Sequence, residues 1–171
     1  MKQQLIALLI FGTTLNSCAQ KKEVDEKKNY PEHVGDIEFN KDLDDPNFKV
    51  CDKDRVLQYY NFTKGFQYKG EKPKINEHFK EVKEDSFKKE TGYVTIRFVV
   101  NCEGKTGRFR IQQMNSDFKE WSFDKKLVDK LLTLTKTLNE WVVGEYEGQV
   151  FDYYQYLTFK IENGKLIEII P

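Results

Sequence analysis

The chain has 171 residues, carries 28 Lys and Arg against 28 Asp and Glu, and is 14% aromatic. Proteins that bind nucleic acid use excess positive charge to neutralise phosphates, so the balanced charge argues against nucleic acid as a partner. The length is sufficient for one domain with a hydrophobic core.

The first 17 residues have the pattern of a secretory signal peptide. Lys2 supplies a positive start, an apolar run covers Leu5–Leu15, and small residues precede Cys18. The apolar run, about 11 residues, covers roughly 16 Å as a helix, whereas a bilayer core needs about 20 residues. We therefore expect residues 1–17 to be removed after export and not to form a permanent span.

The segment Leu15–Cys18 resembles a bacterial lipobox, in which the cysteine is lipidated and becomes the first residue of the mature chain. The lipobox prefers Ala or Gly before the cysteine, and Ser17 is an accepted variant. The resemblance implies a lipid anchor on Cys18 that holds the protein in the cell envelope. Ala19 does not supply the retention signal known for the inner membrane, so we expect the outer membrane, facing the periplasm. An ordinary signal peptide that happens to contain a cysteine is the alternative.

Residues 18–38 are mostly charged and polar and are predicted to form a flexible tether. A domain is predicted to follow, with a helical part at 39–90 and a second part at 91–171. In the helical part, Asp52–Asn61 and Lys74–Glu84 carry apolar residues at helical spacing. We expect a short helix in each segment.

The part at 91–171 alternates between strands and one helix. Strands are predicted at Tyr93–Asn101, Arg108–Met114, Gln149–Ile161 and Lys165–Ile170, from alternating apolar residues and Gly-containing turns. Phe123–Asn139 places its apolar residues on one helical stripe. The expected fold is therefore α+β, an antiparallel sheet of three to four strands with one long helix packed on a face, preceded by two short helices.

Cys51 and Cys102 remain in the chain after Cys18. In an exported domain, two cysteines most often form a disulfide. The loop that such a bond closes corresponds to about 4 kcal/mol of stabilisation in the chain-entropy model. Two buried free thiols and a nucleophilic cysteine are the alternatives. No metal site is expected, because neither His33 nor His78 has a ligand partner at useful spacing.

Catalytic residues are not indicated. The sequence lacks a nucleophile elbow, a phosphate-binding loop and a zinc-protease motif. His78 lies on a predicted amphipathic helix and is expected at the surface. Asp42, Asp44 and Asp45 are residue types that bind calcium, but Pro46 follows where a calcium loop needs further ligands, so a solvated turn is favoured. We expect no enzyme activity, no cofactor and no small-molecule substrate.

Several positions between Thr91 and Ile161 occur in a recognisable order. A Gly precedes a strand that ends in Phe-Val-Val-Asn, a Gly-Lys turn follows, and a Trp and two Gly residues lie between the helix and an aromatic strand. These positions are Gly92, Phe98–Asn101, Gly104, Lys105, Trp141, Gly144, Gly148–Val150 and Phe159. Together they resemble a TonB C-terminal domain. Trp141 also has a simple interpretation as a core residue.

The resemblance implies that partners bind by β-strand addition. In the TonB family, a short peptide of an outer-membrane transporter pairs with the edge of the closing strand, and backbone hydrogen bonds supply much of the affinity. The corresponding edge residues in this chain are Tyr153, Gln155, Leu157 and Phe159. If the tail Lys165–Ile170 folds back beside this strand, it occupies the same edge.

Departures from the family change the expected function. A TonB energy transducer has a membrane helix and a long Pro-rich arm, whereas this chain has four Pro and no predicted span. We expect a non-catalytic, lipid-anchored binding module that contacts envelope proteins through its sheet. The alternative is a TonB-like partner in energy-dependent transport across the outer membrane, which binds peptides of a TonB-dependent transporter by β-strand addition.

Overall fold

The computed structural model describes residues 35–61, 66–84 and 87–170. The predicted signal peptide, Cys18 and most of the predicted tether lie outside these ranges. Within them, every helix is too short or too polar to cross a bilayer.

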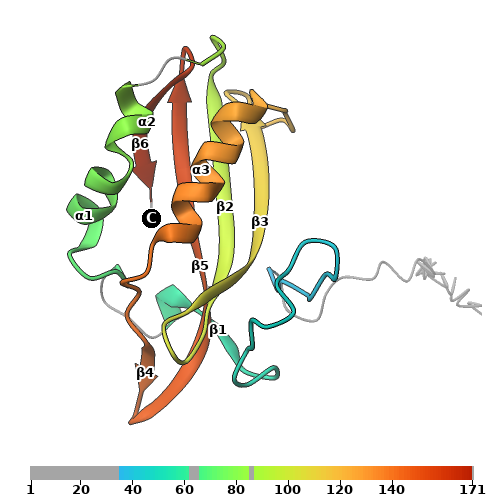
Figure 1. Cartoon of the computed structure of the whole chain (residues 1–171), viewed down its shortest axis with the longest axis vertical. Helices are drawn as coiled ribbons and strands as arrows, with labels where there is room; N and C mark the ends of the chain where they lie inside the picture. Colours follow the sequence, from blue (N-terminus) through green and yellow to red (C-terminus); the bar gives the residue numbers. More distant parts are fainter. Residues whose placement is uncertain (1–34, 62–65, 85–86, 171) are drawn as a thin grey trace, which may run out of the picture.

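Six strands form one mixed sheet around a long central strand (Figure 1). The strand order is β1-β5-β2-β3, and β4 and β6 also pair with β5. All neighbours are antiparallel except β1 and β5, which run parallel. The strands are β1 (Val56–Gln58), β2 (Gly92–Val100), β3 (Thr106–Asn115), β4 (Gly144–Tyr146), β5 (Gln149–Glu162) and β6 (Lys165–Ile170).

The predicted fold class was wrong. The sheet is mixed and has six strands, not three or four antiparallel ones. The helix on its face, α3, spans only Lys125–Thr137, although a long helix from 123 to 139 was expected. The two additional strands, β1 and β4, have three residues each. Their pairing with β5 comes from tertiary structure, because three residues are too few to show a period of two.

The first predicted helix, Asp52–Asn61, is absent. Strand β1 and a single 3-10 turn (Tyr59–Asn61) take its place. Its short apolar run fits a helix or a strand equally well, and pairing with β5 satisfies its backbone groups in the extended form. The second predicted helix, Lys74–Glu84, exists but is divided at Phe79 into α1 (Glu71–His78) and α2 (Lys80–Glu84).

The main core lies between one face of the sheet and the three helices. Alternate residues of a strand face opposite sides, and the side chains of β2 and β5 on the helical side are fully buried. Helices α1, α2 and α3 add further apolar side chains to this cluster. Its members include Ile75, Phe79, Val82, Val94, Ile96, Phe98, Leu127, Leu131, Leu157 and Phe159.

An N-terminal segment (residues 35–55) covers part of the opposite face. Ile37 packs there in a second, smaller cluster with Val99 of β2 and Tyr154 of β5. Phe48 lies directly on Gly107 of β3, where an added Cβ atom would come within 2.3 Å of the Phe48 ring. The packed region therefore begins before residue 38, where the predicted tether ends.

A disulfide and a buried carboxylate fix the end of this segment. Cys51 and Cys102 are bonded, which agrees with the predicted bridge. Beside them, the carboxylate of Asp152 is fully buried in β5. It accepts backbone N–H bonds from Cys51 and Asp52 at 2.8 Å and from Cys102 at 2.9 Å. These bonds join the segment, the β2–β3 turn and β5 at one point.

Candidate functional site

The direction of the backbone N–H and C=O groups in β3 follows from two hydrogen bonds on its outer side. The N–H of Trp121 donates to the C=O of Gln113, and the N–H of Asn115 donates to the C=O of Lys119. In an antiparallel pair, alternate residues bond to the same neighbour. Gln113 and Asn115 therefore direct their backbone N–H and C=O groups away from β2, and Ile111 does the same.

The same alternation gives the direction of each residue in β5. Arg110 lies between two outward-facing positions of β3, so its backbone groups bond to its partner Arg97 in β2. The residues on either side of Arg97 therefore direct their backbone groups to the other neighbour of β2, which is β5. Their partners in β5 are the odd-numbered residues, which include the four predicted edge residues Tyr153, Gln155, Leu157 and Phe159. These four residues are fully buried and direct their backbone groups at β2.

The outer edge of β5 is formed instead by its even-numbered residues, and other strands occupy it. Strand β1 pairs with Asp152–Tyr154. Strand β6, the predicted tail, pairs with Thr158–Glu162. Between them, the C=O of Tyr156 accepts a hydrogen bond from Nε2 of Gln155 at 3.0 Å. The protein's own chain thus covers the edge at which the resemblance implies partner binding.

Strand β3 forms the other border of the sheet (Figure 1). Lys119–Trp121 pairs with its last residues, and the C=O of Phe109 accepts a bond from Arg110 Nη1. Between these points, the N–H and C=O of Ile111 have no partner among the described residues, and the residue is 38% exposed. We take this stretch, residues 109–113, as the candidate site and call it the β3 edge.

An aromatic hollow lies at the upper end of the β3 edge. Ile111, Met114, Phe118 and Trp121 line it together with polar neighbours. Phe118 is 68% exposed and Trp121 is 47% exposed. The Phe118 ring stacks on Tyr93, with centroids 5.5 Å apart. Large apolar side chains at the end of an unpaired strand are typical of a protein-binding surface.

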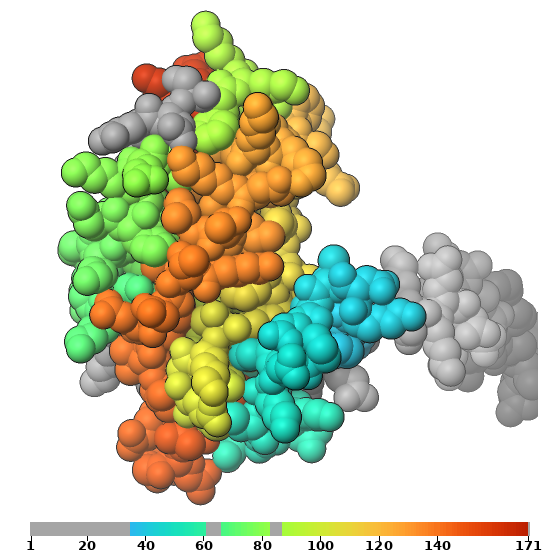
Figure 2. Space-filling view, in the orientation of Figure 1, coloured from blue at the N-terminus to red at the C-terminus, as the bar shows by residue number. Residues whose placement is uncertain are grey.

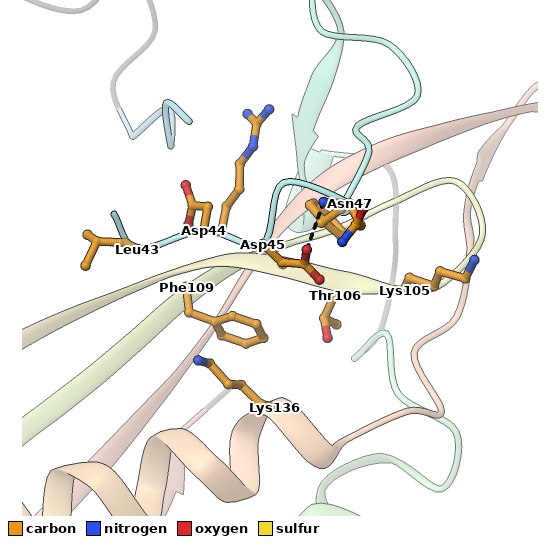
Figure 3. Close-up of a pocket in the computed structure, with 11 residues that line it drawn as sticks. Leu43, Asp44, Asp45, Asn47, Lys105, Thr106, Phe109 and Lys136 are labelled. Carbon is orange, nitrogen blue, oxygen red and sulfur yellow. Dashed lines mark hydrogen bonds between the residues drawn. The ribbon is translucent and has the colours of Figure 1, made fainter. Parts of the chain in front are cut away.

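A charged pocket lies at the lower end of the β3 edge (Figure 3). It is open between the N-terminal segment, the start of β3 and the end of α3. Lys136 reaches from α3 to the ring of Phe109, with Nζ 5.4 Å from the ring centroid. Figure 3 shows the Asp45 carboxylate on the other side of the pocket, where it accepts the N–H of Asn47 at 2.8 Å.

An ion pair between Arg110 and the lining residue Asp44 borders the pocket. Arg110 makes two hydrogen bonds to Asp44, at 2.7 and 2.8 Å. The hydrogen bond from Arg110 holds the pKa of the Asp44 carboxyl below its usual value, and the pKa of Arg110 is raised by the same contact. The turn at Asp42–Asp45, which was predicted to be solvated, is partly buried, because the Asp44 side chain packs against Arg110.

The remaining predicted residues have structural places. Trp141 is buried and makes edge-to-face contacts with Phe98 and Tyr68, which agrees with its interpretation as a core residue. His78 is half-buried, and its Nε2 lies 3.0 Å from the C=O of Leu134 and from Thr137 Oγ1. It therefore ties α1 to the end of α3.

One cluster has the spacing of a metal site. Ligand atoms of Cys51, Cys102 and Asp152 lie within 4.8 Å of one another. However, the two sulfurs are bonded to each other, and both carboxylate oxygens accept backbone hydrogen bonds. This arrangement is a structural clasp and leaves no thiolate to bind a metal.

Sequence reasoning missed Ile111, Trp121, Lys136 and Asp152. Asp152 had a signal, because an acidic residue inside an aromatic strand needs a buried partner. Ile111 lay within the predicted return strand, but the sequence does not show which edge of a sheet stays unpaired. Lys136 looked like one of many surface lysines on the polar side of its helix.

Comparison of the chain with protein-family models, with curated proteins and with solved structures gave no significant match.

Proposed function

We propose that this protein is an exported, lipid-anchored binding module without catalytic activity, and that it contacts another envelope protein through the β3 edge. The observation that carries the proposal is the unpaired backbone of Ile111 between exposed Trp121 and Lys136. An extended segment of a partner gains backbone hydrogen bonds at such an edge. An open sheet edge also promotes aggregation, and proteins usually block such edges. A solvent-exposed edge that is flanked by large apolar side chains therefore indicates a role in binding a partner.

Two further features support the proposal. A disulfide between Cys51 and Cys102 suits an oxidising compartment outside the cytosol, as the predicted signal peptide requires. Strands β2 and β3, helix α3 and strand β5 follow one another along the chain in the order strand, strand, helix, strand on which the TonB resemblance rests, with the short β4 before β5. The lipid anchor itself rests on the lipobox resemblance at Cys18.

The alternative, binding of transporter peptides on the closing strand, requires β6 to leave. Leu166 and Ile169 of β6 are buried in the main core, so their removal exposes apolar surface, at roughly 1.5–3 kcal/mol for each side chain. The β3 edge is accessible without any such change. We therefore prefer the β3 edge for the proposed function.

Photo-crosslinking in intact cells tests the proposal. A photoreactive phenylalanine analogue is placed at Ile111 of the full chain, and a matched probe replaces Ile167, which is 48% exposed on β6. We expect an adduct with one defined envelope protein from position 111 and none from 167. Absence of an adduct at 111 contradicts the proposal, and an adduct at 167 alone supports the alternative site on β5 and β6.

The anchor has its own test. Cys18→Ser removes the predicted lipid attachment point, so we expect the protein to move from the membrane fraction to the soluble periplasmic fraction. Retention of the Cys18→Ser variant in the membrane fraction would contradict the lipid anchor.

A further inference from the structure

Building on the proposed function, we infer that the β3 edge takes an extended peptide, antiparallel to β3, with an apolar residue followed two positions later by an acidic residue. The apolar residue lies against Ile111 and Trp121, and the acidic residue meets Lys136. The order and the spacing both follow from the geometry of the sheet.

The spacing comes from the alternation of side chains. Phe109 and Ile111 point to the helical side of the sheet, because the Phe109 ring stacks on Phe98 and Ile111 pairs with Ile96, and both partners belong to the main core. An added strand places every second side chain on this side. Its residues opposite Ile111 and Phe109 are therefore separated by one residue, whose side chain points to the other face.

The direction comes from a segment that already occupies the neighbouring position. Glu120 bridges to Met114 in the antiparallel sense, and Trp121 lies opposite Gln113. A peptide that continues this line runs antiparallel to β3, starting next to Trp121 and ending near Phe109. Antiparallel pairing is also slightly more stable per residue than parallel pairing.

The first position favours an apolar side chain. Trp121 and Ile111 both line the aromatic hollow, and both expose more than a third of their surface. An aliphatic side chain that covers them removes apolar area from water. Figure 2 shows this part of β3 (yellow) exposed beside α3 (orange), above the N-terminal segment (blue).

The second position favours a carboxylate. Three basic residues line the charged pocket, against Asp44 and Asp45. Asp44 is paired with Arg110, and Lys105 is paired with Glu103 at 2.7 Å. The third lining residue besides Lys105 and Lys136 is Arg108, whose Nη1 donates to the C=O of Ile37 at 3.1 Å. Lys136 forms no ion pair with any acidic residue in the described ranges. Its Nζ lies over the Phe109 ring, so the side chain of the peptide residue that pairs with Phe109 reaches this ammonium group. This leaves Lys136 as the cation that an incoming carboxylate meets.

The neighbouring segment argues against a second copy of this chain as the occupant. In an antiparallel β3–β3 pair centred on Ile111, Phe109 of one copy lies opposite Gln113 of the other. The outward C=O of Gln113 already accepts the N–H of Trp121, so the segment Lys119–Trp121 occupies the place that the second β3 needs. Self-association through Ile111 is therefore an outcome that would overturn the inference.

The test uses capped eight-residue threonine-rich peptides that differ only at two positions. The probe contains Ile-Thr-Glu, and its controls contain Glu-Thr-Ile and Ile-Thr-Lys. Each is titrated into the exported chain carrying Cys18→Ser, and the backbone amide resonances are followed by NMR. We expect shifts at Ile111 and its neighbours, with about fivefold weaker binding of both controls, as loss of one exposed ion pair implies.

Variants separate recognition from folding. Lys136→Glu is expected to reverse the preference between the Ile-Thr-Glu and Ile-Thr-Lys probes, which a purely structural role of Lys136 does not produce. Ile111→Pro removes one outward N–H at an edge position where Pro is tolerated, and we expect it to abolish binding. Trp121→Ala supplies a second variant, expected to weaken binding of the probe, if the spectrum of free Ile111→Pro shows unfolding.

The outcomes are distinct. Equal binding of the three peptides, shifts confined to β5 and β6, or an Ile111-dependent dimer in sedimentation each overturn the inference. If position 111 still crosslinks in cells while the peptides are not distinguished, the binding-module proposal stands and the peptide chemistry is wrong. If position 111 does not crosslink, the proposed function is wrong as well.

Discussion

The carboxylates of Asp152 and Asp44 connect the N-terminal segment to the sheet, and the charge of each is compensated in a different way. Asp152 lies in an apolar layer, where an unpaired carboxylate is very costly, and three backbone N–H groups surround it. Asp44 is paired with the guanidinium of Arg110, whose side chain is partly exposed. Both residues act on one segment, and both contribute to the face of the sheet opposite the helices.

Asp152→Asn should destabilise the fold strongly. The amide keeps one acceptor oxygen, but its NH2 group faces at least one backbone N–H that the carboxylate now satisfies. A buried donor without an acceptor costs about 1–3 kcal/mol. We expect a loss of this size in the free energy of unfolding measured with urea. Asp54→Asn, at an exposed neighbouring position, is the control and should change stability by less than about 0.5 kcal/mol.

Asp44→Asn should remove a pH-dependent part of stability. Because the pKa of Asp44 is lowered in the folded state, its contribution is present above the unfolded value, about 3.9, and is lost as the pH falls through the folded value. We expect the variant to be about 2 kcal/mol less stable at pH 7, and the difference to shrink below about pH 4. A difference that stays constant down to pH 2 contradicts the Asp44–Arg110 explanation, and Asp42→Asn serves as the exposed control.

At the level of elements, long strands were predictable and short ones were not. Strand β2 lies within one residue of its predicted range, because its buried and partly exposed residues alternate over most of its nine positions, which indicates a period of two. Strands β1 and β4 are too short to carry such a pattern. Strand β3 contains an additional irregularity, a register shift next to Arg108, which adopts a positive φ of 55°. Local sequence does not reveal this bulge.

The candidate site shows the same limit. The edge of β5 was a reasonable expectation from the family resemblance, since the closing strand of the motif is an edge strand there. Here, β1 and β6 pair with β5, and the segment that forms β1 is far from it in sequence. Which edge remains open is thus decided by long-range pairing, although Ile111 and Trp121 themselves are plain in the sequence.

Strand β6 should behave as part of the core. Ile169 is 1% exposed and Ile167 is 48% exposed on the same short strand. Truncation of a buried Ile to Ala costs about 2–5 kcal/mol, while exposed truncations usually cost less than about 0.5 kcal/mol. We expect Ile169→Ala to lower stability in urea by the larger amount and Ile167→Ala by the smaller. Equal, small effects would show that β6 detaches readily, and would support the alternative that partners bind at the outer edge of β5.

For the whole molecule, the N-terminal segment and the open edge are connected. The segment borders the charged pocket through Asp44 and Asp45, and it is held to the sheet by the Cys51–Cys102 bond and by Asp152. Its attachment therefore determines the lower boundary of the β3 edge. A change that frees the segment should alter the pocket even though it leaves Ile111 untouched.

The disulfide is expected to contribute most to holding the N-terminal segment on the sheet. Cys51 and Cys102 are 51 residues apart, and the chain-entropy model assigns about 4 kcal/mol to such a loop. We expect the Cys51→Ser, Cys102→Ser double variant to lose up to this amount in urea unfolding, with the NMR shifts of the folded state changing mainly at residues 43–52 and near Lys105. Cys18→Ser alone is the control and should leave stability unchanged. Shifts spread evenly over α3 and β6 would instead mean that the bond supports the main core, and that the pocket boundary does not depend on it.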